Sequence, residues 1–136
     1  MTMHHAGLAD VVRRDPRYAY EAYEFVFQAL AHTQKMLGRT PQAARTEEDA
    51  QYHVRGPELL EGIRDLALRE FGLMARTVFR VWGINHTADI GEIVFNLVAA
   101  NLMSKTEDDC REDFRGVFDM DEALVNGYRI ELEKTE

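Results

Sequence analysis

The chain has 136 residues, of which 46% are hydrophobic and 29% are charged, and its formal net charge at pH 7 is -8. This length suits one domain with a single core, and the composition excludes a chain that is disordered throughout. The negative charge opposes contact with nucleic-acid backbones and anionic membranes, so we expect neither as a partner.

Cysteine usage and hydropathy indicate where the protein works. Cys110 is the only cysteine, so an intrachain disulfide is excluded and a reducing compartment is expected. Residues 1–8 lack the apolar core of a signal peptide, and the longest apolar stretch, residues 93–100 interrupted by Asn96, is too short to span a bilayer. We therefore expect a cytoplasmic protein without a membrane anchor.

The first part of the chain predicts two helices followed by a loop. Apolar spacing at residues 8–12 predicts a short helix that Pro16 ends. Over residues 17–37, apolar positions recur at intervals of three and four, and Gly38 stands where a C-terminal cap is expected. Residues 38–54 show no sustained period, so we predict a mobile loop there.

A third and a fourth helix are predicted next. Gly56 and Pro57 suit a helix start, and the helix that follows should end at Gly72. The fourth helix is expected over residues 73–82, with Gly83 as its cap. Its inward residues are predicted to be Met74, Ala75, Val78, Phe79 and Trp82, and its outward residues Arg76 and Arg80.

The fifth helix is expected at the centre of the fold. It should begin near Thr87 or Asp89, because Asp89 and Glu92 have the spacing of a capping box and both favour a helix N-terminus. The helix is apolar nearly all round through residues 90–102, which is typical of a helix buried on several sides.

The last segment, residues 104–136, is acidic and changes period. It carries 11 Asp and Glu residues against 5 Lys and Arg residues. Tyr128, Ile130 and Leu132 alternate with polar residues, and Asn126-Gly127 before them is typical of a two-residue hairpin turn. The partner strand could be residues 123–125 extended backwards or residues 114–118, and the alternative is a helical turn over residues 121–125.

These elements predict a mainly α, single-domain helical bundle over residues 1–136. It has about five helices and a candidate short C-terminal β-hairpin. Two helices joined by a short turn at residues 83–86, followed by hairpin strands, give an order similar to that of a winged helix. A short helix connection is also the commonest one in helical proteins, so the similarity is a weak signal.

Several short motifs, spread over most of the chain, are fairly specific when taken together. They are Asp15-Pro16-Arg17-Tyr18, Glu21-Ala22-Tyr23, Gly56 with Glu58-Leu59-Leu60-Glu61-Gly62-Ile63-Arg64, Phe71-Gly72 with Met74-Ala75, Val78-Phe79, Trp82-Gly83, Asp89-Ile90-Gly91-Glu92-Ile93-Val94-Phe95-Asn96-Leu97-Val98, Lys105-Thr106-Glu107-Asp108 and Arg111-Glu112-Asp113-Phe114. With them the chain resembles a family of small proteins restricted to Verrucomicrobia and Planctomycetes. That family has no assigned activity, so the resemblance implies no cofactor, partner or catalytic residue.

One candidate metal site arises from residues three apart in the sequence. His86, Asp89 and Glu92 would share a helix face and could offer nitrogen and oxygen ligands to a divalent ion. The alternative is that the two carboxylates satisfy a helix start and that His86 is a turn residue. We favour capping, and we predict no metal and no cofactor.

Arg76 and Arg80 could bind an anion or a phosphorylated partner, whereas the simpler interpretation is an exposed face paired with carboxylates. Together with the three preceding residues, they form our candidate interaction surface. Its members are Arg76, Arg80, His86, Asp89 and Glu92.

Three further patterns have an ordinary explanation that we favour. The acidic residues over 107–122 lack the spacing of an EF-hand, so they are interpreted as a hydrated surface. Acidic neighbours disfavour a reactive thiolate at Cys110. The aromatic residues over 18–27 have helical spacing, which is more typical of a core than of a base-stacking platform.

The sequence thus offers a core and a patterned acidic surface but no coherent catalytic constellation. We predict a small non-catalytic protein-interaction module, with self-association left open. One alternative is a winged-helix-like nucleic-acid-binding protein, although the fifth helix offers only Asn96 and Asn101, with Lys105 beyond its end. The other alternative is an enzyme of unrecognised type.

Overall fold

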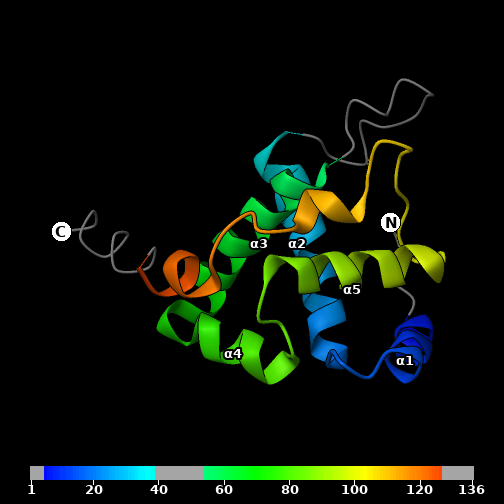
Figure 1. Cartoon of the computed structure of the whole chain (residues 1–136), viewed down its shortest axis with the longest axis horizontal. Helices are drawn as coiled ribbons and strands as arrows, with labels where there is room; N and C mark the ends of the chain where they lie inside the picture. Colours follow the sequence, from blue (N-terminus) through cyan, green and yellow to red (C-terminus); the bar gives the residue numbers. More distant parts are fainter. Residues whose placement is uncertain (1–4, 39–53, 127–136) are drawn as a thin grey trace.

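Five α-helices and three shorter helical turns make up the computed structural model, which describes residues 5–38 and 54–126 (Figure 1). Over this part of the chain the predicted mainly α architecture is confirmed, and the helices form one compact unit. The α-helices are α1 (His5–Arg14), α2 (Tyr20–Met36), α3 (Gly56–Phe71), α4 (Ala75–Trp82) and α5 (Thr87–Ala99). The turns are η3 (Gly72–Met74), η4 (Arg111–Phe114) and η5 (Glu122–Asn126).

The helices α2 and α3 form a close pair because a glycine lies where they meet. A Cβ atom on Gly62 would overlap the Thr33 side chain of α2. The buried Thr33 hydroxyl donates a hydrogen bond to the Ala29 carbonyl at 2.6 Å, so it needs no partner from α3. This local bond lets a polar side chain lie inside the contact without an unsatisfied group.

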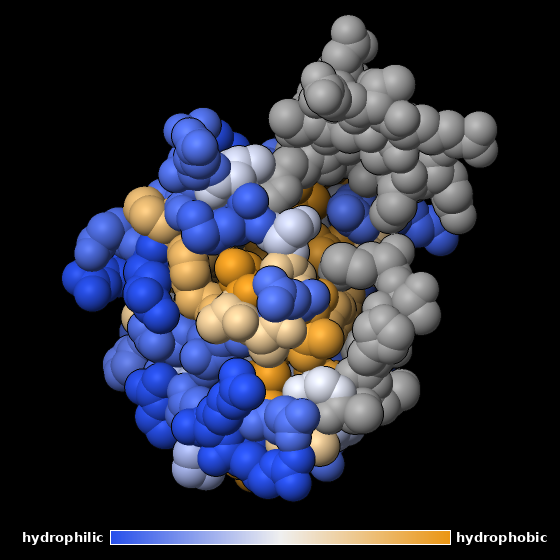
Figure 2. Space-filling view, turned by 90° about the vertical axis from the view of Figure 1, so that its right-hand side faces the viewer, coloured by the Kyte–Doolittle hydropathy of each residue, from blue (hydrophilic) through white to orange (hydrophobic). Residues whose placement is uncertain are grey.

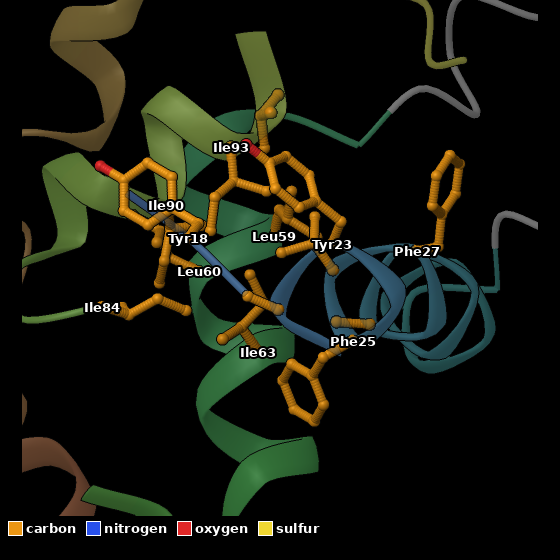
Figure 3. Close-up of a cluster of buried hydrophobic side chains, with 14 of the residues drawn as sticks. Tyr18, Tyr23, Phe25, Phe27, Leu59, Leu60, Ile63, Ile84, Ile90 and Ile93 are labelled. Atoms are coloured by element: carbon orange, nitrogen blue, oxygen red, sulfur yellow. The ribbon is translucent and has the colours of Figure 1, made fainter. Parts of the chain in front are cut away.

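The α5 helix lies against α1, α2, α3 and η4, as its apolar sequence predicts. Ile90, Ile93 and Leu97 are fully buried, and a Cβ atom on Gly91 would come within 2.7 Å of Phe114 Cβ. Figure 3 shows side chains of α2, α3 and α5 meeting in this core. The labelled members include Tyr23, Phe25, Leu59, Leu60, Ile63, Ile90 and Ile93.

The α4 helix begins later than predicted. Gly72 has φ 54°, which ends α3 and starts the 3₁₀ turn η3, so the α-helix runs from Ala75 rather than from Leu73. The inward positions Ala75 and Phe79 are confirmed as buried. The prediction for Met74 was wrong, because the tighter turn before α4 carries its side chain away from the core and leaves it 58% exposed.

The chain after α5 returns across α3 and α4. Met120 and Leu124 are buried there, and the turn η5 contacts both helices. Residues 122–126 therefore form a helical turn, which was the alternative to a strand, and no strand occurs in residues 54–126. The rest of the predicted hairpin, residues 127–136, and most of the predicted loop, residues 39–53, lie outside the described residues.

The side of the molecule formed by α1 and the C-terminal end of α5 has hydrophobic surface in its middle, with hydrophilic residues to the left of it and below it in Figure 2. A Cβ atom on Gly7 of α1 would come within 2.9 Å of Leu102, which follows α5. This close approach places α1 directly on the chain that leaves the central helix. Within the described ranges, no helix is long and apolar enough to cross a membrane.

Candidate functional site

The five residues of the predicted interaction surface belong to two separate sets of contacts. His86, Asp89 and Glu92 lie at the start of α5, whereas Arg76 and Arg80 lie on α4. In the described part of the chain, no hydrogen bond or ion pair joins either arginine to the α5 carboxylates, and no group of His, Cys, Asp and Glu residues gathers to hold a metal ion.

The first set caps α5. One carboxylate oxygen of Asp89 accepts hydrogen bonds from two backbone N–H groups, with N···O distances of 2.9 Å for Asn85 and 3.0 Å for His86. Its other oxygen accepts the hydroxyl of Tyr18 at 2.8 Å. Asp89 thus satisfies two N–H groups at the start of α5 and also ties α5 to the residues before α2, which supports the capping interpretation over the metal interpretation.

A second carboxylate, Asp15, joins the α1–α2 connection to α5. Its two oxygens accept hydrogen bonds from Arg17, one from Nε at 2.8 Å and one from a terminal guanidinium nitrogen at 2.7 Å. Asn96 Nδ2 of α5 donates to Asp15 at 2.8 Å and to the Tyr23 hydroxyl at 3.1 Å. The hydrogen bonds from Arg17 lower the pKa of Asp15 from 3.8 to about 2, against the opposing effect of burial.

Glu92 lies between two arginines on the same side of α5. Arg17 approaches one of its oxygens at 3.5 Å and Arg111 Nε approaches the other at 3.3 Å. The Arg111 guanidinium also lies 4.9 Å from the centroid of the Phe95 ring. We call the eight residues of these contacts the polar network. They are Asp15, Arg17, Tyr18, Tyr23, Asp89, Glu92, Asn96 and Arg111.

The chemistry of the polar network is that of a structural clamp. Burial raises the pKa of the hydroxyls of both Tyr18 and Tyr23, so they stay protonated and act as hydrogen-bond donors or acceptors. The carboxylates are paired with arginines, amides or backbone N–H groups. The arrangement therefore positions α2 against α5.

Replacing Asp15 with asparagine is expected to cost about 1–2 kcal/mol of unfolding free energy at pH 7, because the charged hydrogen bonds to Arg17 are lost. The folded pKa of about 2 lies below the ordinary value of 3.8, so this contribution is present above pH 3.8 and disappears as the pH falls toward 2. Urea unfolding of both proteins at pH 7 and near pH 2 measures the difference.

The control for this prediction is Asp10→Asn, which removes an exposed ion pair with Arg13 on α1. That variant should change the unfolding free energy by less than about 0.5 kcal/mol at either pH. Equal effects of the two variants at pH 7 would show that Asp15 does not clamp the fold.

A smaller polar contact ties α2 to α3. Asp65 accepts Arg69 Nε at 2.7 Å and lies 2.8 Å from Nε2 of His32. Burial alone would raise the pKa of Asp65, but the hydrogen bonds from His32 and Arg69 lower it. The contact supports the α2–α3 pair and shares no residue with the polar network.

The second set of contacts shows that Arg76 is mainly structural. Its side chain is only 13% exposed, and its Nε donates to Asp121 at 2.9 Å. A terminal nitrogen lies 3.4 Å from the Ile84 carbonyl oxygen. The prediction that Arg76 points outward was therefore wrong, because the side chain is mostly buried and pairs with Asp121, which lies 45 positions later in the chain. Arg80 is exposed, as predicted, and has no ion-pair partner within residues 54–126.

Three of the six large apolar side chains that are exposed in residues 5–38 and 54–126 lie on the outward side of η3 and α4. Leu73 is 56% exposed, Met74 58% and Val81 77%, although all three side chains are large and apolar. Thr77 and Val81 are four residues apart on α4 and therefore share one side of it, and Leu73 and Met74 lie in the turn η3 just before the helix. We call Leu73, Met74, Thr77, Arg80 and Val81 the α4 outer face.

The α4 outer face rests on a rigid base. Trp82 of α4 packs against Phe25 of α2, Phe71 of α3 and Phe79 of α4, with ring centroids 5.5 to 5.9 Å apart. Such aromatic contacts fix the orientation of the helix beneath its exposed side. The sequence prediction missed this face because Val81 was not assigned to either side of the helix. The position of Val81 directly after the outward Arg80 was the signal that could have indicated its exposure.

Comparisons with known proteins give no information on function, so the functional argument rests on the residues and their contacts. The chain matches no family model, no curated protein and no solved structure. The resemblance to the Verrucomicrobia and Planctomycetes family therefore stays a prediction.

Proposed function

We propose that this protein is a small non-catalytic interaction module that binds another protein through the α4 outer face. The observation that carries the proposal is the gathering of three large exposed apolar side chains, Leu73, Met74 and Val81, within nine residues. Single exposed apolar residues are normal on protein surfaces, whereas a contiguous apolar patch beside polar residues is typical of a contact surface.

The size and charge of the face define the kind of partner. A helix of eight residues is about 12 Å long, so the face suits a short apolar segment rather than a broad flat surface. Arg80 lies at its edge without an ion-pair partner in the described ranges. A carboxylate next to the apolar residues of the partner would pair with this guanidinium.

The features of α5 favour a protein partner over a nucleic acid. In a helix-turn-helix arrangement α5 would be the recognition helix, but Thr87–Ala99 contains no Lys or Arg. Its polar residues include Asp89 and Glu92, which would repel phosphates. The buried side of the helix is occupied by the core residues Ile90, Ile93 and Leu97.

Site-specific photocrosslinking tests the proposal. A photoreactive phenylalanine analogue replaces Val81 in one version of the chain and Val117, an exposed apolar residue after η4, in a control version. In extract of the source cells we expect one protein to crosslink at position 81 and not at position 117. The same protein, purified, must repeat this pattern. Crosslinking that is equal at both positions would overturn the proposal.

A further inference from the structure

We propose that residues 117–126, which we call the strap, occupy part of the binding site in the free protein, and that a partner with an acidic, amphipathic segment displaces them. The inference rests on the proposed function, because it names the kind of partner and the way in which the protein regulates access to the same site. Opening of the strap would add the guanidinium group of Arg76 to the α4 outer face.

The strap is held together by hydrogen bonds of its own. The carbonyl oxygen of Asp119 accepts the backbone N–H of Ala123 at 2.9 Å, and its carboxylate accepts the backbone N–H of Glu122 at 3.0 Å. The chain then forms the turn η5, which is π-helical, and π-helical turns are rare and often lie at functional sites. The strap can therefore leave α3 and α4 as one unit, with its local hydrogen bonds intact.

The joint before the strap is suited to movement. Gly116 is exposed and has φ 58°, and a Cβ atom there would meet nothing within 4 Å. Glycine adopts many backbone conformations at little cost. The first residue of the strap, Val117, donates its N–H to the Thr87 hydroxyl at 3.3 Å, which is long for such a bond. Rotation at Gly116 would therefore break one weak hydrogen bond and no packing of the glycine itself.

The closed strap is held by apolar side chains and by one ion pair. The turn η5 contacts α3 and α4 (Figure 1), and Met120, Ala123 and Leu124 are buried. At the edge of this contact, Asp121 accepts a hydrogen bond from Arg76 Nε at 2.9 Å while its side chain stays 70% exposed. Water and competing charges reach an exposed carboxylate, so the ion pair is the part of the contact that a partner meets first.

Opening of the strap would place two guanidinium groups together on α4. Arg76 and Arg80 are four residues apart, so they share one side of the helix, next to the side that carries Thr77 and Val81. In the closed protein, Asp121 neutralises Arg76, whereas Arg80 is already exposed. The open surface therefore combines apolar residues with two cations one helical turn apart.

The strap itself shows what such a partner offers. Met120 and Leu124 are buried and four residues apart, and the acidic pair Asp121-Glu122 lies between them. A partner segment with the same pattern would bury equivalent apolar surface and pair with both arginines. In the part of the chain that the structure describes, Arg80 has no ion-pair partner. A second carboxylate at this place gives the partner an advantage over the strap.

Thiol reactivity tests the opening in the full chain. Cys110→Ser removes the native exposed thiol, and Ala123→Cys then places one buried thiol in the strap. The matched control is Ala29→Cys, at a buried alanine of α2. We expect iodoacetamide to react at least about tenfold faster at position 123 than at position 29, because local opening requires less free energy than global unfolding. Met120→Cys gives a second position in the strap with the same expectation.

Removal of the ion pair makes this test specific for the strap. Asp121→Asn should raise the rate at position 123 by about threefold or more and leave the rate at position 29 unchanged, because the closed strap loses its pairing with Arg76. The control Glu112→Gln removes an ion pair that lies before the joint and should change neither rate. Equal rates at the two positions, or a ratio that Asp121→Asn does not change, would overturn the inference.

A fluorescent peptide with the sequence of residues 117–126 tests the chemistry of the partner. Fluorescence anisotropy measures its binding to the full chain with Asp121→Asn, in which the strap opens more readily. We expect Arg76→Gln and Arg80→Gln each to weaken binding by about threefold or more, and the exposed control Arg115→Gln to leave it unchanged. Equal binding of this peptide and of its form with both acids amidated, or no binding at the highest soluble concentration, would overturn the inference.

These measurements separate the inference from the proposed function. If Asp121→Asn does not change the ratio of thiol rates but Val81→Glu still prevents binding of the purified partner, the inference fails and the proposed function stands. If the strap opens and the peptide binds as expected but Val81→Glu does not affect the partner, the proposed function fails instead. Sedimentation of the Asp121→Asn chain as a dimer would show straps exchanged between two copies and would overturn the inference.

Discussion

Replacing Leu97 with alanine is expected to lower the free energy of unfolding by about 2–5 kcal/mol. Leu97 is fully buried in α5, which contacts α1, α2, α3 and η4. The smaller side chain loses apolar burial and leaves a cavity that surrounding helices fill only in part. Urea unfolding followed by circular dichroism measures the change.

The matched control is Leu73→Ala, which makes the same chemical change on the exposed α4 outer face. It should change the unfolding free energy by less than about 0.5 kcal/mol. A similar small effect for Leu97→Ala would contradict the central position of α5.

Replacing Gly83 with alanine is expected to cost about 2–4 kcal/mol, from backbone strain and from a clash. Gly83 caps α4 with φ 93°, a backbone conformation that residues other than glycine rarely adopt. A Cβ atom there would also overlap the backbone carbonyl oxygen of Arg17, which no rotamer change can relieve. The neighbouring bond from Ala19 N–H to the Trp82 carbonyl, 3.1 Å, would be disturbed as well.

Gly38→Ala separates strain from clash. Gly38 has φ 70°, but a Cβ atom there would meet nothing within 4 Å. This variant should therefore cost only about 1 kcal/mol, from strain alone. Equal thermal unfolding midpoints for the two variants would show that the residues just before α2 do not pack against the end of α4 as described.

The helices that local signals define were predictable from the sequence. Gly56 and Pro57 mark the start of α3, and Gly72 marks its end, because each residue has a conformational role at a helix terminus. The central place of α5 followed from its apolar residues on all sides. In these cases the determining interactions lie within a few residues of each other.

The contacts that the sequence prediction missed join residues far apart in the chain. Asp15 meets Asn96 across 81 positions, and Arg76 meets Asp121 across 45 positions. Periodicity assigns a residue to a helix face but does not say which distant element covers that face. The burial of Arg76 and the polar network therefore required the folded arrangement.

The α4 outer face illustrates the same limit in the opposite direction. An apolar residue such as Val81 is expected to be buried, since burial of its side chain is favourable. It is exposed because α4 has the aromatic base of Phe25, Phe71 and Trp82 on one side and no described element on the other. Sequence spacing alone does not distinguish a helix covered on two sides from one covered on a single side.

The measurement that tests the central claim most directly is the affinity of the purified crosslinking partner for three versions of the full chain. Calorimetric titration would compare the unchanged chain, Val81→Glu on the α4 outer face, and Val117→Glu away from it. We expect Val81→Glu to weaken binding by at least about tenfold, or 1.4 kcal/mol, and Val117→Glu to leave it unchanged. Equal affinities for all three folded proteins would contradict the assignment of the α4 outer face as the contact surface.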